Sequence, residues 1–354
     1  MKNSVVPSVK RLTMGADVTR KPTLLDVADL AGVSTATVSN VINDTKYVGD
    51  EVKRKIHEAI ETLNYIPNNL AKSLRVKESK LIGLMISDIS NPFFPPVVRG
   101  IEDVLARNGF NVLLCDTDTD PVKERNYLKV LLGRRIDGLI VSLAGAEYSH
   151  FQDLDIPVVF FNRIPETGSY NTVQTANVEG AFLATTHLLS HDYKRIAIVA
   201  GPQHLSVGRE RLVGYREALE KSGSAYDPDL VKVSPFNSDG GYSAMKELME
   251  QDKKPDAVFT CNNVLTLGAF RFLRESGFKI PSQIALVGYD DPDWTTLVDP
   301  PLTVIRQQSF EMGLETGGLI LDCLKKKESK GARKIVMSLE LGIRKSCGCN
   351  VGQK

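Results

Sequence analysis

The segment GVSTATVSNVIND, residues 32–44, places a short polar side chain at almost every position that is not apolar. Ser, Thr and Asn compete for backbone hydrogen bonds, so they add little to the stability of a helix. Their hydroxyl and amide groups can instead exchange hydrogen bonds with a polar partner. The segment therefore indicates recognition of another molecule. The alternative is a small helical cap whose polar residues are incidental.

A second group of polar and aromatic side chains follows short apolar runs. In open α/β sheets, ligands bind outside the carboxyl ends of the strands. The shared position of these residues therefore predicts a ligand cleft, although each residue singly is equally well explained by a local hydrogen bond in a loop. The group consists of SDISNPFF (87–94), Asn162, Arg163, Asn262, Asn263 and Asp290.

The usual chemical motifs of α/β enzymes are absent from the sequence. It contains no GxGxxG after a first strand, no P-loop, no GxSxG and no HExxH. The histidines lie apart and the five cysteines form no CxxC pair, so we expect no catalytic residue, metal site or cofactor. The CGC at 347–349 is expected to belong to a solvated, reduced tail.

Length and charge indicate a protein of two or three folding units with a basic head. The chain has 354 residues, of which 42% are hydrophobic and 25% charged. Residues 1–80 hold 13 Lys and Arg against 9 Asp and Glu, whereas the rest holds 31 against 34. This asymmetry is typical of a nucleic-acid reader joined to another domain. Without a signal-peptide core or a membrane-length apolar run, we expect a cytoplasmic protein without a membrane partner.

Three short helices are predicted before residue 65. Thr23 followed by Asp26 resembles a capping box at the start of the first helix, and the glycine after that helix permits a tight turn. Ser34 or Thr35 is expected to cap the second helix and Asp50 the third. Two helices joined by a glycine-containing turn and braced by a third form a helix-turn-helix unit.

From residue 81, apolar runs alternate with helical stretches. Unbroken apolar strands separated by helices indicate parallel sheets with helices on both faces. The runs are too many for one sheet and the pattern restarts near 172–201, so we expect an α/β fold of two similar lobes with a ligand between them. The strands are predicted at 81–87, 110–115, 138–143, 156–161, 195–201, 256–261 and 284–289.

The motifs TLLDVADLAGVSTATVSNVIND, LNYIPNNLAKSLR, ISNPFF, HLLSHDYKRIAIVAGP, RERLVGY and VGYDD follow one another along the chain. Together they resemble the lactose-repressor/galactose-repressor (LacI/GalR) family of bacterial transcription regulators over residues 22–344. The resemblance implies a three-helix helix-turn-helix head, a hinge helix and a two-lobed periplasmic-binding-protein-like effector domain. A transport-type binding protein shares the two lobes, but it would need export and would lack the head.

The resemblance also implies partners and a role. We expect a homodimer that represses a carbohydrate-related operon from a pseudo-palindromic operator, under the control of a small-molecule effector, or of a phosphoprotein co-regulator as in some relatives. The expected organisation is a basic extension (1–21), a helix-turn-helix domain (22–66), a hinge helix and linker (67–80), an effector-binding and dimerisation domain (81–344) and a C-terminal tail (345–354).

By resemblance, the second helix reads DNA in the major groove. An Asn side chain at position 40 suits adenine, whereas the best-known members carry Arg or His there, so the operator half-site should differ. The base-reading positions are then Thr35, Ala36 and Asn40, the phosphate-facing positions are Ser34, Thr37, Ser39 and Asn43, and Thr23 and Leu24 complete the set in this domain.

In the family, a Leu from each of two hinge helices wedges into the minor groove at the central base step. The corresponding residue here is Leu74, with Ala71 and Arg75 near the groove walls. Without the resemblance, Leu70 and Leu74 would more simply form a small apolar staple against the effector domain.

By resemblance to sugar-binding relatives, the effector cleft is lined by Ser87, Asn91, Phe93, Phe94, Asn162, Arg163, Arg209, Phe236, Asn262, Asn263 and Asp290. Sugar-binding relatives usually have Asp at the positions of Asn162 and Asn263. Loss of both acids leaves Arg163 and Arg209 less neutralised, so we hypothesise an anionic effector such as a sugar acid or a sugar phosphate. A neutral sugar is the alternative, because a neighbouring acid such as Asp88 or Asp290 can compensate for both changes.

Overall fold

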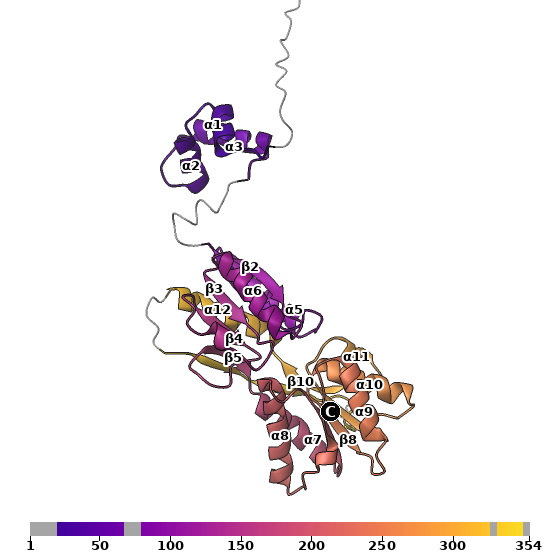
Figure 1. Cartoon of the computed structure of the whole chain (residues 1–354). Helices are drawn as coiled ribbons and strands as arrows, with labels where there is room; N and C mark the ends of the chain where they lie inside the picture. The colour runs from indigo at the N-terminus through magenta and orange to yellow at the C-terminus, as the bar shows by residue number, and fades with distance from the viewer. Residues whose placement is uncertain (1–19, 67–78, 326–330, 350–354) are drawn as a thin grey trace, which may run out of the picture. The chain divides into compact units, whose positions relative to one another are not determined.

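The computed structural model describes residues 20–66, 79–325 and 331–349 (Figure 1). The chain divides into two compact units, Met1–Glu78 and Ser79–Lys354. The predicted hinge contacts Ala71, Leu74 and Arg75 lie outside the described residues, as does most of the predicted N-terminal extension. Within the described ranges, no helix is both long and apolar enough to cross a membrane.

The first unit is a bundle of three helices around a small apolar core. Its fully buried side chains come from all three helices, which is why none of these short helices has to be stable alone. The helices are α1 (Leu24–Ala31), α2 (Thr35–Asn43) and α3 (Asp50–Leu63), and the buried residues are Val27, Ala28, Val38, Ile56 and Ala59.

Side-chain hydrogen bonds cap the N-terminal ends of α1 and α2. The predicted capping box is confirmed: the Thr23 amide donates to the Asp26 carboxylate at 2.6 Å, and the Asp26 amide donates to the Thr23 hydroxyl at 3.4 Å. Ser34 caps α2, because its hydroxyl accepts from a backbone amide of the first turn at 3.2 Å. The predicted cap of α3 is wrong. Gly49 is the N-cap, and Asp50 is the first helical residue, where its charge favours the positive end of the helix dipole.

The second unit has two lobes, each built on a six-stranded sheet. In the first lobe the strands run β11-β5-β4-β3-β1-β2, all parallel. Successive residues of β3 alternate between two apolar clusters, one shared with α5 and α12 and the other with α6, so helices cover both faces. The elements are β1 (Leu81–Ile86), α5 (Phe94–Arg107), β2 (Asn111–Asp116), α6 (Pro121–Gly133), β3 (Gly138–Val141), η1 (Ser149–Phe151), β4 (Val158–Phe161), β5 (Asn171–Thr175), α12 (Ser309–Lys325) and β11 (Lys334–Met337).

The second lobe repeats the arrangement with the strand order β12-β10-β9-β8-β6-β7. Its strands are parallel except for β12, which is antiparallel to β10. Its elements are α7 (Asn177–Leu189), β6 (Ile196–Ala200), α8 (Ser206–Ser222), η2 (Pro228–Leu230), β7 (Val231–Val233), α9 (Ser238–Met249), β8 (Ala257–Thr260), α10 (Asn263–Glu275), β9 (Ala285–Tyr289), α11 (Trp294–Leu297), β10 (Thr303–Gln307) and β12 (Leu339–Gly342).

The chain crosses between the lobes three times: after β5, after β10 and between β11 and β12 (Figure 1). The two sheets were expected from the sequence, whereas the strands β5, β7, β10, β11 and β12 were not. These three connections hold the two lobes beside one another, and hinge segments of this kind permit the lobes to rotate about the crossing points.

The expectation of a solvated C-terminal tail is wrong for Ser346 and Cys347, whereas Lys345 and Gly348 are exposed. Ser346 and Cys347 are fully buried in the second lobe. The Ser346 hydroxyl accepts from the Thr303 amide at 2.8 Å and donates to the Leu286 carbonyl at 2.6 Å. These bonds attach the segment to two strands of the sheet.

Candidate DNA-reading surface and effector cleft

The predicted base-reading residues lie on the first two turns of α2. Thr35 and Ala36 are exposed at its N-terminal end. Asn40 lies one turn after Ala36 on the same face. Its Oδ1 accepts from the Thr45 hydroxyl at 2.9 Å, while its amide NH₂ has no partner within the described part of the unit. This end of α2 therefore presents small side chains that let a partner come close to the backbone.

The predicted phosphate-facing residues all have partners within the unit. The Ser34 and Thr37 hydroxyls lie 2.9 Å apart, and the side-chain amide of Asn43 donates to the Ser39 backbone carbonyl at 2.8 Å. These bonds hold the ends of α2. A phosphate at these positions would have to share their donors.

The two remaining predicted residues of this unit also have local roles. Thr23 belongs to the capping box of α1, and Leu24 packs against the core of the bundle. Their position at the start of α1 is therefore explained by folding alone.

Asn263 joins the two lobes of the second unit. Its Nδ2 donates to Asn91 Oδ1, 2.9 Å away in the first lobe, and to Asp290 Oδ2 at 2.8 Å. Gln307, at a crossing point, donates to the other oxygen of Asp290. The side chains of Asn263, Asn91 and Asp290 are at most 7% exposed. An amide at 263 therefore satisfies Asp290, where a second carboxylate would repel it.

Arg163 is a buried cation between the lobes. It follows β4, directly after Asn162, and is 5% exposed. Its Nη1 donates to the Thr119 hydroxyl at 3.3 Å, and its guanidinium lies 5.5 Å from the ring centre of Phe236 in the second lobe. No carboxylate pairs with it among the described residues. Burial lowers the pKa of Arg163 to about 10, so the group stays charged near pH 7.

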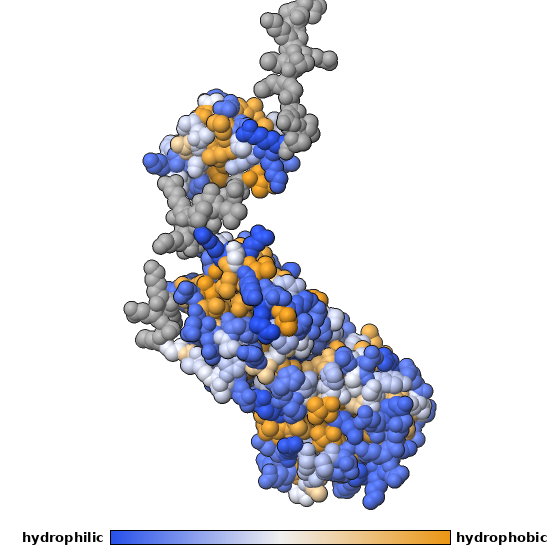
Figure 2. Space-filling model, viewed as in Figure 1, coloured by the Kyte–Doolittle hydropathy of each residue, from blue (hydrophilic) through white to orange (hydrophobic). Residues whose placement is uncertain are grey.

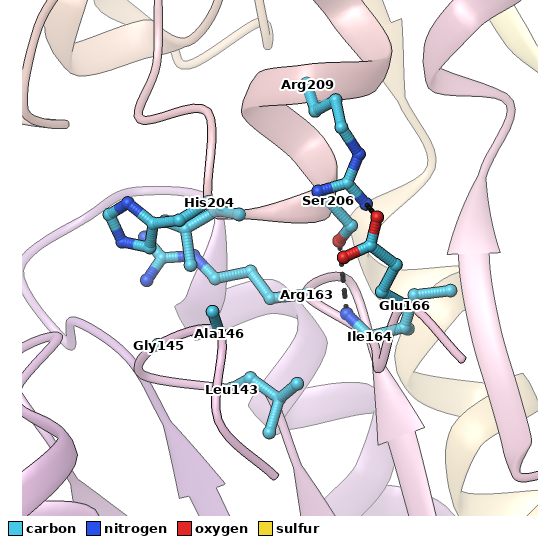
Figure 3. A pocket seen from close by; sticks show the side chains of 10 residues that line it. Leu143, Gly145, Ala146, Arg163, Ile164, Glu166, His204, Ser206 and Arg209 are labelled. Atoms are coloured by element: carbon cyan, nitrogen blue, oxygen red, sulfur yellow. Dashed lines mark hydrogen bonds and ion pairs between the residues drawn. The ribbon is translucent and has the colours of Figure 1, made fainter. Parts of the chain in front are cut away.

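A small pocket of about 20 Å³ lies beside Arg163 (Figure 3). Ser206 and Arg209 line it from the second lobe. The Ser206 hydroxyl accepts from the Ile164 amide at 3.2 Å, and Arg209 lies 3.6 Å from Glu166. The inference that Arg209 is left without a neutralising acid is therefore wrong. Arg163 differs, because no carboxylate forms an ion pair with it among the described residues, although Asp88 and Glu124 lie near enough to raise its pKa.

A second and larger pocket, of about 270 Å³, combines three other predicted residues: Phe93, Asn263 and Asp290. Asp291 and Asp293 also line it, so its charge is negative. Five of the eleven predicted effector residues thus line a pocket: Arg163 and Arg209 line a cationic one, and Phe93, Asn263 and Asp290 line an acidic one. Asn91, Asn162 and Phe236 line neither pocket.

Three predicted residues occupy other environments. Phe94 is 2% exposed and packs edge-on against Phe161, so it belongs to the core of the first lobe. Asn262 caps α10, since its Oδ1 accepts from the Leu265 amide at 2.9 Å. Ser87 is fully buried at the end of β1, and its hydroxyl has no partner among the described residues.

Sequence reasoning missed Arg211, a second buried cation. It is 3% exposed, donates to Asn177 Oδ1 at 2.9 Å and stacks 3.6 Å from the ring centre of Tyr289. The signal was its helical spacing, because Val207 and Tyr215, four residues before and after it, are both buried. An arginine within an apolar stripe is unusual enough to draw attention.

Comparison with known proteins identifies the family. Residues 79–342 match the periplasmic binding proteins and sugar binding domain of the LacI family, and residues 23–68 match the bacterial regulatory proteins of the lacI family. The chain belongs to the LacI family. The resemblance inferred from the sequence is confirmed, with the α/β fold and the helix-turn-helix head. This LacI-family chain is a DNA-binding transcription regulator and not an enzyme.

Individual LacI-family relatives cover most of the chain. The HTH-type transcriptional repressor PurR of Histophilus somni (strain 129Pt) is 34% identical over 330 residues, 92% of this chain and 98% of the relative. The ribose operon repressor of Escherichia coli (strain K12) is 34% identical over 295 residues, 82% of this chain and 89% of the relative.

Solved structures of LacI-family proteins share the fold. A complex of the transcriptional regulator CelR with cellobiose is 32% identical, with a TM-score of 0.71 over 92% of this chain and 99% of the other. The Lac repressor dimer bound to operator and the anti-inducer ONPF is 26% identical, with a TM-score of 0.82 over 93% and 99%.

Proposed function

We propose that the chain is a homodimeric repressor of a carbohydrate-related operon and that its effector is a small anion, such as a sugar phosphate or a sugar acid. It acts in the cytoplasm on a pseudo-palindromic operator. The names of the ribose operon repressor and of the CelR complex with cellobiose support the link with carbohydrates. Arg163 is the observation that carries the anionic effector.

The physical argument rests on the cost of a buried charge. An ionised group away from water is costly unless an opposite charge or strong hydrogen bonds compensate it. Arg163 has one hydroxyl and one aromatic ring as direct partners. Burial and the positive charge of Arg211 lower its pKa, whereas the carboxylates of Asp88 and Glu124 raise it without forming an ion pair with it among the described residues. An anion between the lobes supplies the missing opposite charge.

Such an anion would also couple the two lobes. Arg163 follows β4 in the first lobe, whereas Phe236, Ser206 and Arg209 belong to the second. A ligand that contacts both sides favours their closed arrangement and thereby shifts the population of lobe geometries. Whether closure strengthens or weakens operator binding is decided by measurement.

The acidic pocket supports a second candidate, a neutral sugar. Carboxylates such as Asp290 accept hydrogen bonds from sugar hydroxyls, and the ring of Phe93 offers an apolar face. The two candidates differ in charge, so one panel of compounds separates them.

An apolar surface of the first lobe supports the homodimer. Val122 and Val130 on α6 and Leu114 on the edge strand β2 are 56%, 57% and 44% exposed. Figure 2 shows apolar side chains over these two elements. Exposed apolar areas of this kind mark interaction sites, and an edge strand is open to pairing. A second copy of the chain is the proposed occupant.

The test is operator binding by fluorescence anisotropy at one fixed salt concentration, because phosphate contacts make affinity salt-dependent. A pseudo-palindrome selected from random sequence serves as the operator. Neutral sugars, sugar acids, sugar phosphates and nucleobases are added in turn. We expect an anionic sugar derivative to change the affinity and the neutral sugars to have no effect.

The variant Arg163→Met should weaken the response to the anion by at least about 30-fold, because truncating a buried charged partner costs about 2 kcal/mol or more. Arg99→Met, at an exposed residue of α5, is the matched control and should respond like the wild type. A response to neutral sugars alone would make the effector neutral. A folded, operator-bound protein that ignores every compound would favour a protein co-regulator.

A further inference from the structure

A cluster of imidazole and thiol groups lies on the second lobe, outside both pockets. Cys349 Sγ is 3.0 Å from His191 Nε2 and 3.6 Å from His187 Nε2. The three ligand-type atoms all lie within 4.8 Å of one another. Cys349 lies 158 residues after His191 in the sequence, so the sequence alone did not connect the thiol with the two histidines.

Two elements bring the cluster together. His187 lies in the last turn of α7, and His191 follows the C-cap Ser190, so the two rings are one helical turn apart and meet edge to face with centroids 4.8 Å apart. Cys349 comes from the C-terminal segment. Cys349 can reach the two histidines only because the C-terminal segment folds back onto the end of α7.

The backbone of the segment is held in that position. The Tyr193 hydroxyl donates to the Cys347 carbonyl at 3.2 Å. Gly348 has φ 92°, which favours glycine, and a Cβ at this position would lie 2.7 Å from the Tyr193 hydroxyl. With Ser346 bonded to β9 and β10, the CGC turn directs the sulfur of Cys349 towards the two imidazoles.

The geometry points to a zinc site formed by His187, His191 and Cys349. Zinc binds imidazole nitrogen at about 2.0 Å and thiolate sulfur at about 2.3 Å, so its tetrahedral ligand atoms lie about 3.5 Å apart. The sulfur-to-nitrogen distances of 3.0 and 3.6 Å lie on either side of this value. Two imidazoles and a thiolate suit zinc better than the hard cations Mg²⁺ or Ca²⁺, which prefer oxygen.

The three side chains leave one position of a tetrahedral zinc ion open. In zinc sites with three protein ligands, a water molecule takes the fourth position. The neighbouring Cys347 sulfur is fully buried and has other partners, since it accepts from the Thr303 hydroxyl at 3.0 Å and donates to the Arg344 carbonyl at 3.4 Å. His187, His191 and Cys349 therefore supply three of the four ligands.

A zinc ion at this position would fasten the C-terminal segment to α7. The unfolded chain lacks the site, so binding stabilises the folded state in proportion to the logarithm of the free metal concentration. The cluster lies outside the proposed effector pocket and the DNA-reading head, so it acts on the stability of the second lobe.

The experiment uses the full chain without an affinity tag, reduced and stripped of metal. Co²⁺ is added as a spectroscopic probe and is then displaced by Zn²⁺, and bound zinc is counted by mass spectrometry after desalting. We expect one zinc per chain, a sulfur-to-cobalt charge-transfer band and a rise of the melting temperature with zinc.

Cys349→Ser and His191→Ala should each weaken zinc binding by more than about 100-fold, beyond the loss seen when residues that only orient ligands are changed. Cys115→Ser, on β2 of the first lobe, is the matched control and should bind zinc like the wild type. Operator binding checks that every variant is folded. Substoichiometric zinc in the wild type, or unchanged affinity in Cys349→Ser, would overturn the proposal.

Discussion

At the scale of single residues, the charge of the cleft depends on which partner each side chain finds. The sequence suggested that asparagine at 162 and 263 leaves two arginines without acids. In the structure, the Asn263 side chain donates hydrogen bonds to Asp290 and Asn91, and Arg209 forms an ion pair with Glu166. Glu166 lies 43 residues before Arg209 and in the other lobe, so no local pattern could reveal the pair. The anionic proposal therefore depends on one buried guanidinium rather than on two.

Asp291 is a residue whose charge should make stability depend on pH. Burial raises its pKa, but hydrogen bonds from Arg344, Thr295 and Arg306 outweigh burial and hold the pKa below the ordinary value of 3.8. Arg344 contacts both carboxylate oxygens, at 2.8 and 2.6 Å. Because the folded pKa is depressed, this stabilisation is present above pH 3.8 and is lost as pH falls through the folded value.

We therefore expect Asp291→Asn to lower the free energy of unfolding by about 2 kcal/mol at pH 7, the contribution of hydrogen bonds to a charged group. The difference from wild type should shrink as the pH falls below about 4. Urea unfolding at a series of pH values measures it. Asp192→Asn, at a 94% exposed carboxylate paired with Lys194, is the control and should stay within about 0.5 kcal/mol of wild type. A deficit independent of pH would contradict the assignment.

At the scale of elements, glycine determines how closely two helices of the first lobe approach. A Cβ on Gly100 of α5 would lie 2.3 Å from the Phe310 carbonyl oxygen, and one on Gly313 of α12 would lie 2.2 Å from that of Val97. Both contacts are with backbone, which cannot move aside as a side chain can. The two helices therefore pack with their backbones in direct contact.

Gly313→Ala should accordingly destabilise the protein by about 1–3 kcal/mol, the usual cost of overpacking. Gly318→Ala is the matched control on the same helix. Nothing lies within 4 Å of its new Cβ, so it should stabilise by up to about 1 kcal/mol through helix propensity. Thermal or urea unfolding of both variants gives the comparison. Equal effects of the two substitutions would show that the contact between α5 and α12 is looser than described.

The same glycines explain part of what the sequence left unpredicted. The segment SFEMGLETGGLILDCLK forms α12, but its three glycines obscure the helical pattern. The strands that were missed, such as VKV in β7 and LELG in β12, are short and mixed in polarity. Pairing with neighbouring strands defines them. Six of the seven predicted apolar runs are largely buried, so their composition alone indicates a strand, and the exception is the partly exposed edge strand β2.

Like the strands and helices, the candidate site could be predicted from the sequence only in part. Strand-end position placed Asn263 and Asp290 near one another, because the order of parallel strands brings their carboxyl ends together. It could not distinguish Phe93, which lines a pocket, from Phe94, which packs in the core. Adjacent residues at the start of a helix point about 100° apart, and only the packing of α5 decides which one faces inward.

At the scale of the whole molecule, recognition of a palindrome requires two heads. One head offers a single short helix with small side chains, so its own affinity for DNA is expected to be low. Linking two heads in a dimer turns the second contact into an intramolecular event and can raise affinity by about 10²- to 10⁴-fold. The apolar surface on β2 and α6 is the proposed means of linkage.

A charge on this surface should therefore separate the protomers and weaken operator binding together. We expect Val130→Glu, at a 57% exposed position of α6, to sediment as a monomer at micromolar concentration and to bind the operator about 100-fold more weakly. Leu297→Glu is the control, because Leu297 is 81% exposed on α11 of the second lobe; it should remain dimeric with wild-type affinity. Analytical ultracentrifugation and anisotropy on the same samples give both quantities. If Val130→Glu stays dimeric while Leu297→Glu dissociates, the copies associate through the second lobe instead.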